Sequence, residues 1–161
     1  MGISMKRLDL VDSAKSREIL NKVSFFNIFS QPEKSILAGF HSHYFIANPG
    51  TRIIEQGGMD QSFYIILTGQ VSVQHATANA PLAVLSPGDF FGEVSFLTDR
   101  RRTTSIIAEA KTILFEIDKT TLRNLSSPIR EKLKDNIIKI LVQRLENMNL
   151  RVIELNQITS R

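Results

Sequence analysis

Residues 88–106 are Gly-Asp-Phe-Phe-Gly-Glu-Val-Ser-Phe-Leu-Thr-Asp-Arg-Arg-Arg-Thr-Thr-Ser-Ile, and they combine the residue types that a nucleotide pocket needs. Gly92 lets the backbone approach a ligand closely, because it has no Cβ atom. The carboxylate of Glu93 can accept hydrogen bonds from a sugar hydroxyl group. The short segment 94–97 can form one helical turn, whose first N–H groups attract an anion. Arg102 offers a planar fork suited to phosphate, so the stretch indicates a nucleotide-binding site.

This stretch resembles the phosphate-binding cassette of the cyclic nucleotide-binding domain family. The family pattern is Phe-Gly-Glu, a small and an aliphatic residue, a short loop, and then an arginine followed by small residues and a strand. Here the pattern stands as Phe91-Gly92-Glu93-Val94-Ser95-Phe96-Leu97 and Arg102-Thr103-Thr104-Ser105-Ile106. Residues 57–73, Gly-Gly-Met-Asp-Gln-Ser-Phe-Tyr-Ile-Ile-Leu-Thr-Gly-Gln-Val-Ser-Val, resemble the family's central hairpin. The resemblance covers about residues 20–158, which is nearly the whole chain.

The resemblance implies an α+β fold, mainly β: an antiparallel β-roll, similar to a jelly-roll barrel, with N-terminal helices and a long C-terminal helix. It also implies a non-catalytic sensor or regulatory module for a 3′,5′-cyclic nucleotide, either cAMP or cGMP. On the family pattern, Arg102 and the backbone of Ser95 and Thr103 hold the phosphate, and Glu93 binds the ribose 2′-hydroxyl group. The residues expected at the ligand are Gly92, Glu93, Val94, Ser95, Arg102, Thr103, Val73, Leu82 and Ala83.

Some of these assignments have competing interpretations. Val73, Leu82 and Ala83 lie where the family lines the base with apolar side chains, but they fit an ordinary core equally well. Thr103 can bond a guanine amino group in cGMP-binding members of the family, and it also fits a plain strand. Arg102 is preferred over the two arginines before it, Arg100 and Arg101, because it is the last arginine before the small residues.

The sequence pattern of residues 44–117 is typical of β-structure. Pro-Gly pairs at 49–50 and 87–88 each suit a type II turn, with proline first and glycine second. Several short β-branched runs at this spacing indicate a sandwich or a barrel-like roll. The expected strands are Thr51–Glu55, Phe63–Leu67, Gln70–Gln74, Leu82–Leu85, Thr104–Ile107 and Thr112–Ile117.

Helical patterns flank the β-region on both sides. We therefore expect an N-terminal helical segment at 1–43, the β-roll at 44–117 with the cassette at 88–106, and a C-terminal segment at 118–161. In the first segment, residues 13–23 are expected to be helical, and Ser30 and Glu33 form a capping box that begins a second helix running to about Phe40. The apolar residues between these two helices are expected to fill the core, and they are Phe25, Phe26, Ile28 and Phe29.

The C-terminal segment is expected to hold a short hinge helix followed by a long one. Asp118 is expected to cap the short helix, and Ser127, before Pro128, is expected to cap the long one. Apolar residues then follow a heptad pattern with β-branched residues at two a positions, which favours a parallel two-stranded coiled coil and hence a homodimer. Packing of the same stripe on the β-roll is the alternative. The stripe consists of Ile138, Leu141, Leu145, Met148, Val152 and Leu155.

The same long helix is expected to close over the bound base as a lid. Family analogy implies that the cassette contracts around the phosphate and that the helices after Asp118 then move. Polar side chains near the middle of the helix are candidates for contacts with the purine, and they are Arg144, Glu146 and Asn147.

Composition places further bounds on the function. The chain has 161 residues, a net charge of +4 and no cysteine, so it can form neither a disulfide nor a thiolate metal site. No apolar run approaches the ~18 residues of a membrane span, and we expect a cytoplasmic protein without a membrane contact. Transcription factors that resemble the catabolite activator protein continue after this helix into a helix-turn-helix. The chain stops at Arg161, so we expect no direct contact with nucleic acid.

Two other readings compete with the cyclic nucleotide sensor. A small metal-dependent β-barrel enzyme is one, because His41 and His43 resemble half of a cupin ligand set. The nearest following acid, Glu55, is too distant to complete the motif, and we expect no bound metal. The other is a sensor fragment of a transcription regulator that has exchanged its nucleotide for haem or another effector. The unknown output domain or effector protein is not encoded in these residues.

Overall fold

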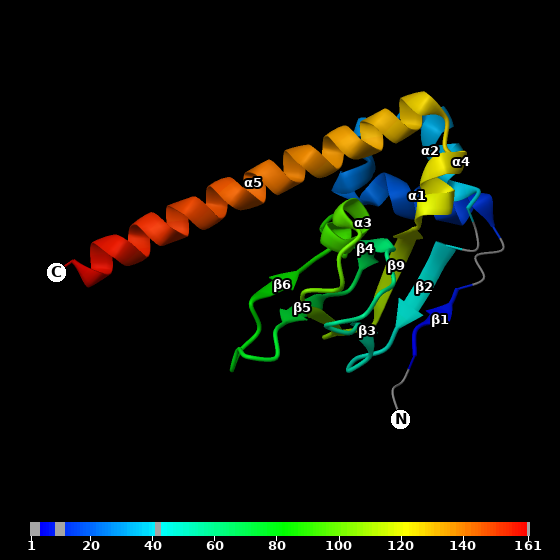
Figure 1. The fold of residues 1–161 in the computed structure, drawn as a ribbon. Helices are drawn as coiled ribbons and strands as arrows, with labels where there is room; N and C mark the ends of the chain where they lie inside the picture. The colour runs from blue at the N-terminus through cyan, green and yellow to red at the C-terminus, as the bar shows by residue number, and fades with distance from the viewer. Residues whose placement is uncertain (1–3, 9–11, 41–42, 161) are drawn as a thin grey trace. The chain divides into compact units, whose positions relative to one another are not determined.

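The computed structural model describes residues 4–8, 12–40 and 43–160. The chain divides into two compact units, Met1–Asn124 and Leu125–Arg161. The first unit holds all the strands of the described residues (Figure 1), and the second is a helix. The three-part division at 43 and 117 stays a prediction about functional segments.

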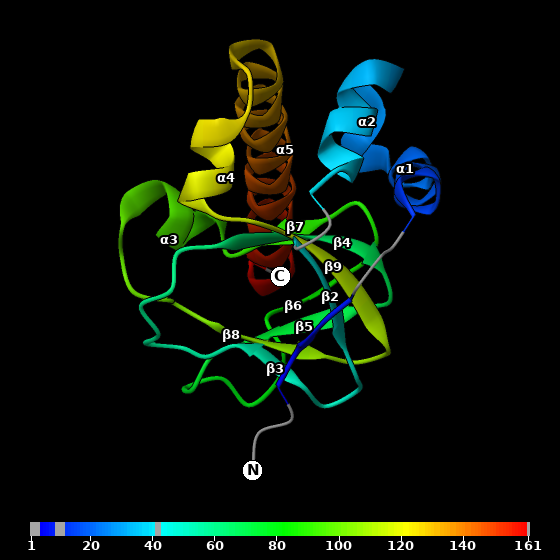
Figure 2. The same ribbon diagram turned by 90° about the vertical axis from the view of Figure 1, so that its right-hand side faces the viewer.

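Two antiparallel sheets form the β-part of the first unit, which confirms the expected fold class (Figure 2). The strands of the five-stranded sheet are, in spatial order, β1 (Lys6–Arg7), β2 (Tyr44–Ala47), β9 (Thr112–Ile117), β4 (Phe63–Thr68) and β7 (Phe90–Phe91). Those of the four-stranded sheet are β3 (Arg52–Ile54), β8 (Ser105–Ala108), β5 (Val71–Gln74) and β6 (Ala83–Leu85). The two sheets do not join into a closed barrel, which corrects the barrel-like part of the expectation.

The expected strands are all present, with Thr112–Ile117 unchanged and no boundary shifted by more than one residue. The structure adds β1, β2 and β7, which have no separate place among the expected strands. β1 and β7 have only two residues each, too few for an alternating pattern to be visible. Both Pro-Gly turns are confirmed, since Gly50 and Gly88 have φ values of 83° and 93° and the closing hydrogen bonds are both 3.0 Å long.

Three helical elements precede the sheets: α1 (Ser13–Lys22), the 3₁₀ helix η1 (Ser24–Ile28) and α2 (Gln31–Ala38). The capping box at the start of α2 is confirmed, with Ser30 and Glu33 bonded reciprocally. Phe25, Phe26 and Phe29 are buried as expected, but Ile28 is 40% exposed. That part of the core expectation is wrong, because the 3₁₀ turn places Ile28 on its outer side.

Aromatic rings connect the helical elements to the larger sheet. Phe25 of η1 meets Phe90 edge to face at 5.8 Å between ring centroids, and Phe90 in turn lies 6.3 Å from Phe63. Phe63 contacts Phe96 of α3 (Glu93–Thr98) at 4.8 Å. The cassette helix is therefore held against a core that is continuous with the N-terminal segment.

Two helices follow the last strand: α4 (Lys119–Asn124), which ends the first unit, and α5 (Ser127–Thr159). Asp118 caps α4 as expected, accepting a hydrogen bond of 2.6 Å from the backbone of Thr121. The N-cap of α5 is Ser126, with extended backbone, and not Ser127 as expected. Pro128 therefore occupies the second helical position, where its missing N–H is equally harmless.

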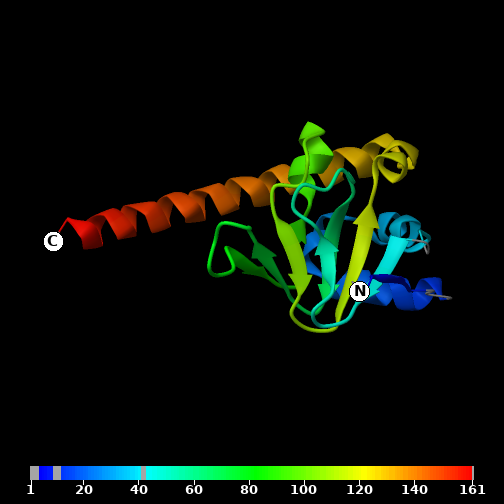
Figure 3. The same ribbon diagram turned by 60° about the horizontal axis from the view of Figure 1, so that its bottom comes forward.

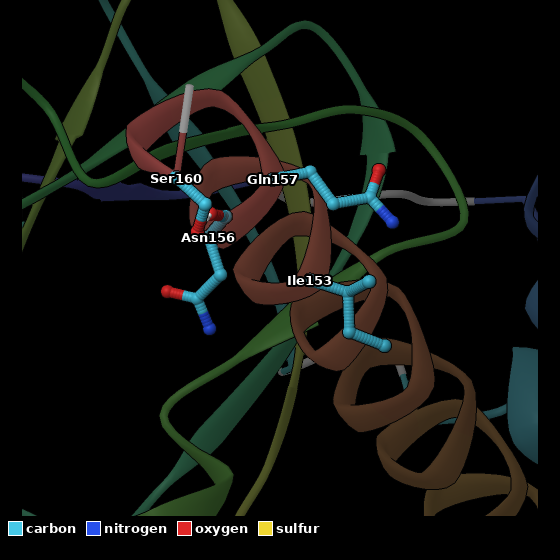
Figure 4. A pocket seen from close by; sticks show the side chains of 4 residues that line it. All are labelled: Ile153, Asn156, Gln157 and Ser160. Atoms are coloured by element: carbon cyan, nitrogen blue, oxygen red, sulfur yellow. Dashed lines mark hydrogen bonds between the residues drawn. The ribbon is translucent and has the colours of Figure 1, made fainter.

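The helix α5 is one uninterrupted element of 33 residues (Figure 3). Ile129, Leu133 and Ile137 are buried in its first turns. The heptad residues beyond them are exposed by 54–62%, except Leu141, which is half-buried. Figure 4 shows the last turns, where Ile153, Asn156, Gln157 and Ser160 line an open hollow. Among the described residues, no helix is both long and apolar enough to cross a bilayer.

The turn between β4 and β5 depends on Gly69, which leads to a stability prediction. Gly69 has a φ of +89°, and a Cβ atom there would lie 2.5 Å from the Lys111 carbonyl oxygen and 2.6 Å from the Thr112 Cα atom. Gly50 has a similar φ of +83° with open space around it. In urea denaturation, we expect Gly50→Ala to cost about 1–2 kcal/mol and Gly69→Ala to cost about 3 kcal/mol or more. Equal costs would contradict this packing.

Candidate functional site

The side chain of Arg102 is the buried centre of the cassette. Arg102 is only 3% exposed, whereas Arg100 and Arg101 lie at the surface. Its backbone is held on both sides, because its N–H donates to the Gly58 carbonyl at 2.8 Å and its carbonyl accepts from Gly57 N–H at 2.7 Å. Burial and backbone pairing together distinguish Arg102 from its two neighbours.

The guanidinium group is surrounded by acceptors of the protein. Nε donates to Asp60 Oδ1 at 3.3 Å, Nη1 donates to the Gly92 carbonyl at 2.8 Å, and Nη2 contacts both Asp60 Oδ2 and the Ser62 carbonyl. Within the described part of the chain, these bonds use four of the five N–H groups of an arginine, which leaves one Nη1 N–H for a ligand oxygen. The buried charge is therefore compensated and rigidly oriented.

Gly92 makes room for this arginine, and Gly58 lies beside it in a tight turn. A Cβ atom on Gly92, whose φ is +84°, would lie 2.8 Å from Arg102 Nη1 and 2.9 Å from the Ser62 carbonyl oxygen. A Cβ atom on Gly58 would lie 2.9 Å from the Glu55 carbonyl oxygen and 3.5 Å from Arg102 Cγ. Gly92 is also the N-cap of α3, so the helix begins beside the guanidinium group.

The other predicted site residues are partly gathered here. Glu93 and Ser95 lie in the first turn of α3, with Glu93 half-buried and Ser95 buried, while Val94 is 42% exposed. Thr103 follows Arg102 and is exposed. Gly92, at the start of the helix that carries Glu93, Val94 and Ser95, therefore contacts the guanidinium group directly.

The predicted base-lining residues lie on the β5–β6 hairpin. Val73 is half-buried and packs against the core cluster that contains Ile54 and Ile106. Leu82 is 55% exposed, and Ala83, paired with Val73 across the hairpin, is also exposed. Val73 thus serves the core, and the base-lining role of the three residues stays a prediction.

Sequence reasoning missed Asp60 and the Ser62 carbonyl as partners of the arginine. Asp60 belongs to the segment that resembles the family's hairpin, and a buried arginine requires a counter-ion, but neither observation selects this acid among the others. The sequence also gave no reason to single out Tyr64, whose pKa responds to Asp60 and Arg102. Burial raises the pKa of Tyr64 above its usual value, and the carboxylates of Glu116 and Asp60 raise it further, so Tyr64 donates its hydroxyl proton to Glu116 at 3.3 Å.

The histidines do not form a metal site within the described residues, where no group of three potential ligands is found. His43 contacts the Thr121 hydroxyl, and His75 contacts Gln56 and Thr77. His41 lies outside the described residues. The cupin reading therefore has no support in this arrangement.

The buried arginine leads to a prediction that needs no ligand. Replacing Arg102 by leucine leaves the carbonyl groups of Gly92 and Ser62 without this donor, and we expect the free energy of unfolding to fall by about 2–4 kcal/mol. The matched control is Arg101→Leu, which removes one exposed bond to the Gly57 carbonyl and is expected to cost about 1 kcal/mol or less. Similar costs in urea denaturation would show that the Arg102 bonds contribute little.

Comparison with known proteins agrees with this arrangement. The chain is 30% identical over 147 residues to a cAMP-dependent protein kinase regulatory subunit of Dictyostelium discoideum, covering 84% of this chain and 44% of that protein. It is 30% identical over 135 residues to a cGMP-dependent protein kinase of Caenorhabditis elegans, covering 81% of this chain and 17% of that protein. The chain spans less than half the length of these curated relatives.

A solved structure and a family model complete the comparison. The crystal structure of a cyclic nucleotide-binding domain from Methylobacillus flagellatus KT shares the fold, with a TM-score of 0.76, 22% identity and coverage of 92% of this chain and 88% of that one. The model of the cyclic nucleotide-binding domain matches residues 46–127, which are 82 of the 161 residues and include Gly92, Glu93 and Arg102. This protein therefore belongs to the cyclic nucleotide-binding domain family.

Proposed function

We propose that the chain is a non-catalytic regulatory module that binds one 3′,5′-cyclic nucleotide, cAMP or cGMP, at the cassette. The observation that carries the proposal is the buried, four-fold hydrogen-bonded Arg102 beside the N-cap of α3. The cyclic phosphate accepts from the remaining Nη1 N–H group and from the backbone N–H groups of Ser95 and Thr103. The Glu93 carboxylate accepts from the ribose 2′-hydroxyl group.

The chemical class of ligand is supported more strongly than the identity of its base. The two relatives described above are named for different nucleotides, one for cAMP and one for cGMP. Thr103 is exposed, and its hydroxyl group can donate a hydrogen bond to a guanine or accept one from it, so cGMP is a possible ligand as well as cAMP. Titration with both nucleotides therefore tests the ligand class and the selectivity together.

The response to the ligand is proposed to pass through α4 to α5. A ligand shifts the position of a helix only by its differential affinity for the two arrangements. If α5 closes over the ligand, the base gains contacts that are missing in the open arrangement, and these raise the affinity of the closed one. The candidates for these contacts are Arg144, Glu146 and Asn147. Arg144 is half-buried and the other two are exposed.

The first test is isothermal titration calorimetry with cAMP and with cGMP. We expect wild-type protein to bind one of them with one site per chain, and Arg102→Lys to bind about tenfold to a hundredfold more weakly, because lysine keeps the charge but lacks the fork. Arg101→Lys is the matched control and should retain wild-type affinity. Absence of binding by the wild type, or unchanged affinity of Arg102→Lys, contradicts the proposed site.

We propose further that α5 forms a parallel homodimer through its exposed heptad stripe. Ile138 and Val152 place β-branched side chains at a positions, which suits two parallel strands. Single exposed apolar residues are normal on a protein surface. A stripe in which five apolar side chains are each more than half exposed is not normal.

The dimer proposal predicts the mass in solution. Leu145→Lys places a charge in the stripe and should shift the protein to a monomer in analytical ultracentrifugation. Leu150→Lys is the matched control, because Leu150 is equally exposed, at 59%, but lies at an f position away from the stripe. A monomeric wild type, or equal effects of the two variants, rules out this interface.

A further inference from the structure

Gln56 lies in the loop between β3 and β4 and makes contacts through its backbone N–H and through both ends of its side-chain amide. Its backbone N–H donates to Ser105 Oγ at 2.9 Å. Its side-chain Oε1 accepts from the backbone N–H of Ala76 at 2.9 Å, and its Nε2 lies 3.2 Å from His75 Nε2. The bond from Ala76 fixes which end of the amide is oxygen, so Nε2 is the end that faces His75.

The imidazole of His75 has polar neighbours at both ring nitrogens. Its Nδ1 lies 2.8 Å from Thr77 Oγ1 and 3.2 Å from the backbone nitrogen of Thr77, and its Nε2 lies 3.2 Å from Gln56 Nε2. The backbone N–H of Ala78 donates to the His75 carbonyl at 3.0 Å and closes the turn that follows β5. Gln56 is thus bonded to a well-formed turn rather than to a loose loop.

The three segments that Gln56 joins carry different parts of the proposed site. The next residue, Gly57, donates to the Arg102 carbonyl, so the 56–57 loop holds the phosphate end. Ser105 begins β8, three residues after Arg102. The turn at 75–78 belongs to the β5–β6 hairpin, which carries the predicted base-lining residues.

Gln56 acts from the face of the four-stranded sheet that points away from the core. Gln74 and Ser105 are paired across β5 and β8, and their neighbours Val73 and Ile106 pack in the core cluster. Successive side chains of a strand alternate between faces, so Gln74 and Ser105 point outward. An open hollow of about 550 Å³ lies here, lined among others by Gln56, His75 and Ser105. Gln56 therefore influences a ligand on the inner side only through the segments it holds.

We propose that Gln56 is a positioning residue that fixes the base-lining hairpin relative to the loop holding Arg102. The inference rests on the proposed function and adds a residue that sets how much the base contributes to binding. Loss of the Gln56 side chain frees the hairpin while Arg102 keeps Asp60, Gly92 and Ser62 as partners. The affinity lost should then belong to the base and not to the sugar phosphate.

The experiment compares a cyclic nucleotide with a base-free probe, 1-O-methylribose 3′,5′-cyclic phosphate, measured by displacement calorimetry. For Gln56→Leu, we expect the affinity for the nucleotide that the wild type prefers to fall about fivefold to thirtyfold, as for the loss of one or two hydrogen bonds. The affinity for the base-free probe should change by less than about twofold. Leucine has a similar volume and faces the open hollow, so it introduces no clash.

Two further variants separate positioning from general stability. Gln74→Leu alters a glutamine of the same hollow. Among the residues that the structure describes, its side chain bonds to Ser72 of its own strand alone, and both affinities should stay at the wild-type level. Gln56→Glu keeps an acceptor for Ala76 and offers a carboxylate to His75, which can then donate from Nε2. We expect this variant to recover most of the nucleotide affinity.

Each result has a distinct meaning. A parallel loss for the nucleotide and the base-free probe shows that Gln56 only stabilises the fold, and unchanged nucleotide affinity of Gln56→Leu shows that the hairpin is held without it. Either result overturns the inference and leaves the proposed function intact. Failure of the wild type to bind any cyclic nucleotide overturns the proposed function, and the inference with it.

Discussion

The structure of the cassette depends on how the charge of Arg102 is buried. A guanidinium group taken out of water is costly unless its N–H groups find acceptors, and here a carboxylate and two carbonyl groups supply them. Asp60 and Ser62 lie 42 and 40 residues before Arg102, and Gly92 lies 10 residues before it. Burial of one arginine therefore draws three chain segments to one point and orients its last N–H group.

Glycine makes this convergence sterically possible. Gly92 supplies its carbonyl oxygen at a distance that a Cβ atom would not allow, and its positive φ begins α3 at the same place. The Gly57–Gly58 loop pairs with the Arg102 backbone on its other side and continues into Gln56. The Arg102 segment, the start of α3 and the 57–58 loop are thus held together through backbone groups, which tolerate change in most side chains around them.

The long helix follows a different physical logic. Its first turns bury apolar side chains, but the later heptad residues remain exposed in a single chain. Burying such a stripe is favourable by roughly 25 cal/mol for each Å² of apolar surface removed from water, so contact with a partner helix would lower the free energy. The orientation and identity of that partner depend on the few residues at the a and d positions.

Local patterns were sufficient for much of this protein. The Pro-Gly turns, the capping box at Ser30 and the main strands follow from φ preferences, capping bonds and β-branched runs, each acting over a few residues. The choice of Arg102 among three arginines came from the family resemblance, and its burial is a tertiary fact. Asp60 as its counter-ion, the exposure of Ile28 and the bonds of Gln56 depend on segments distant in sequence. Periodicity describes which side a residue faces, whereas only packing decides which distant group it meets there.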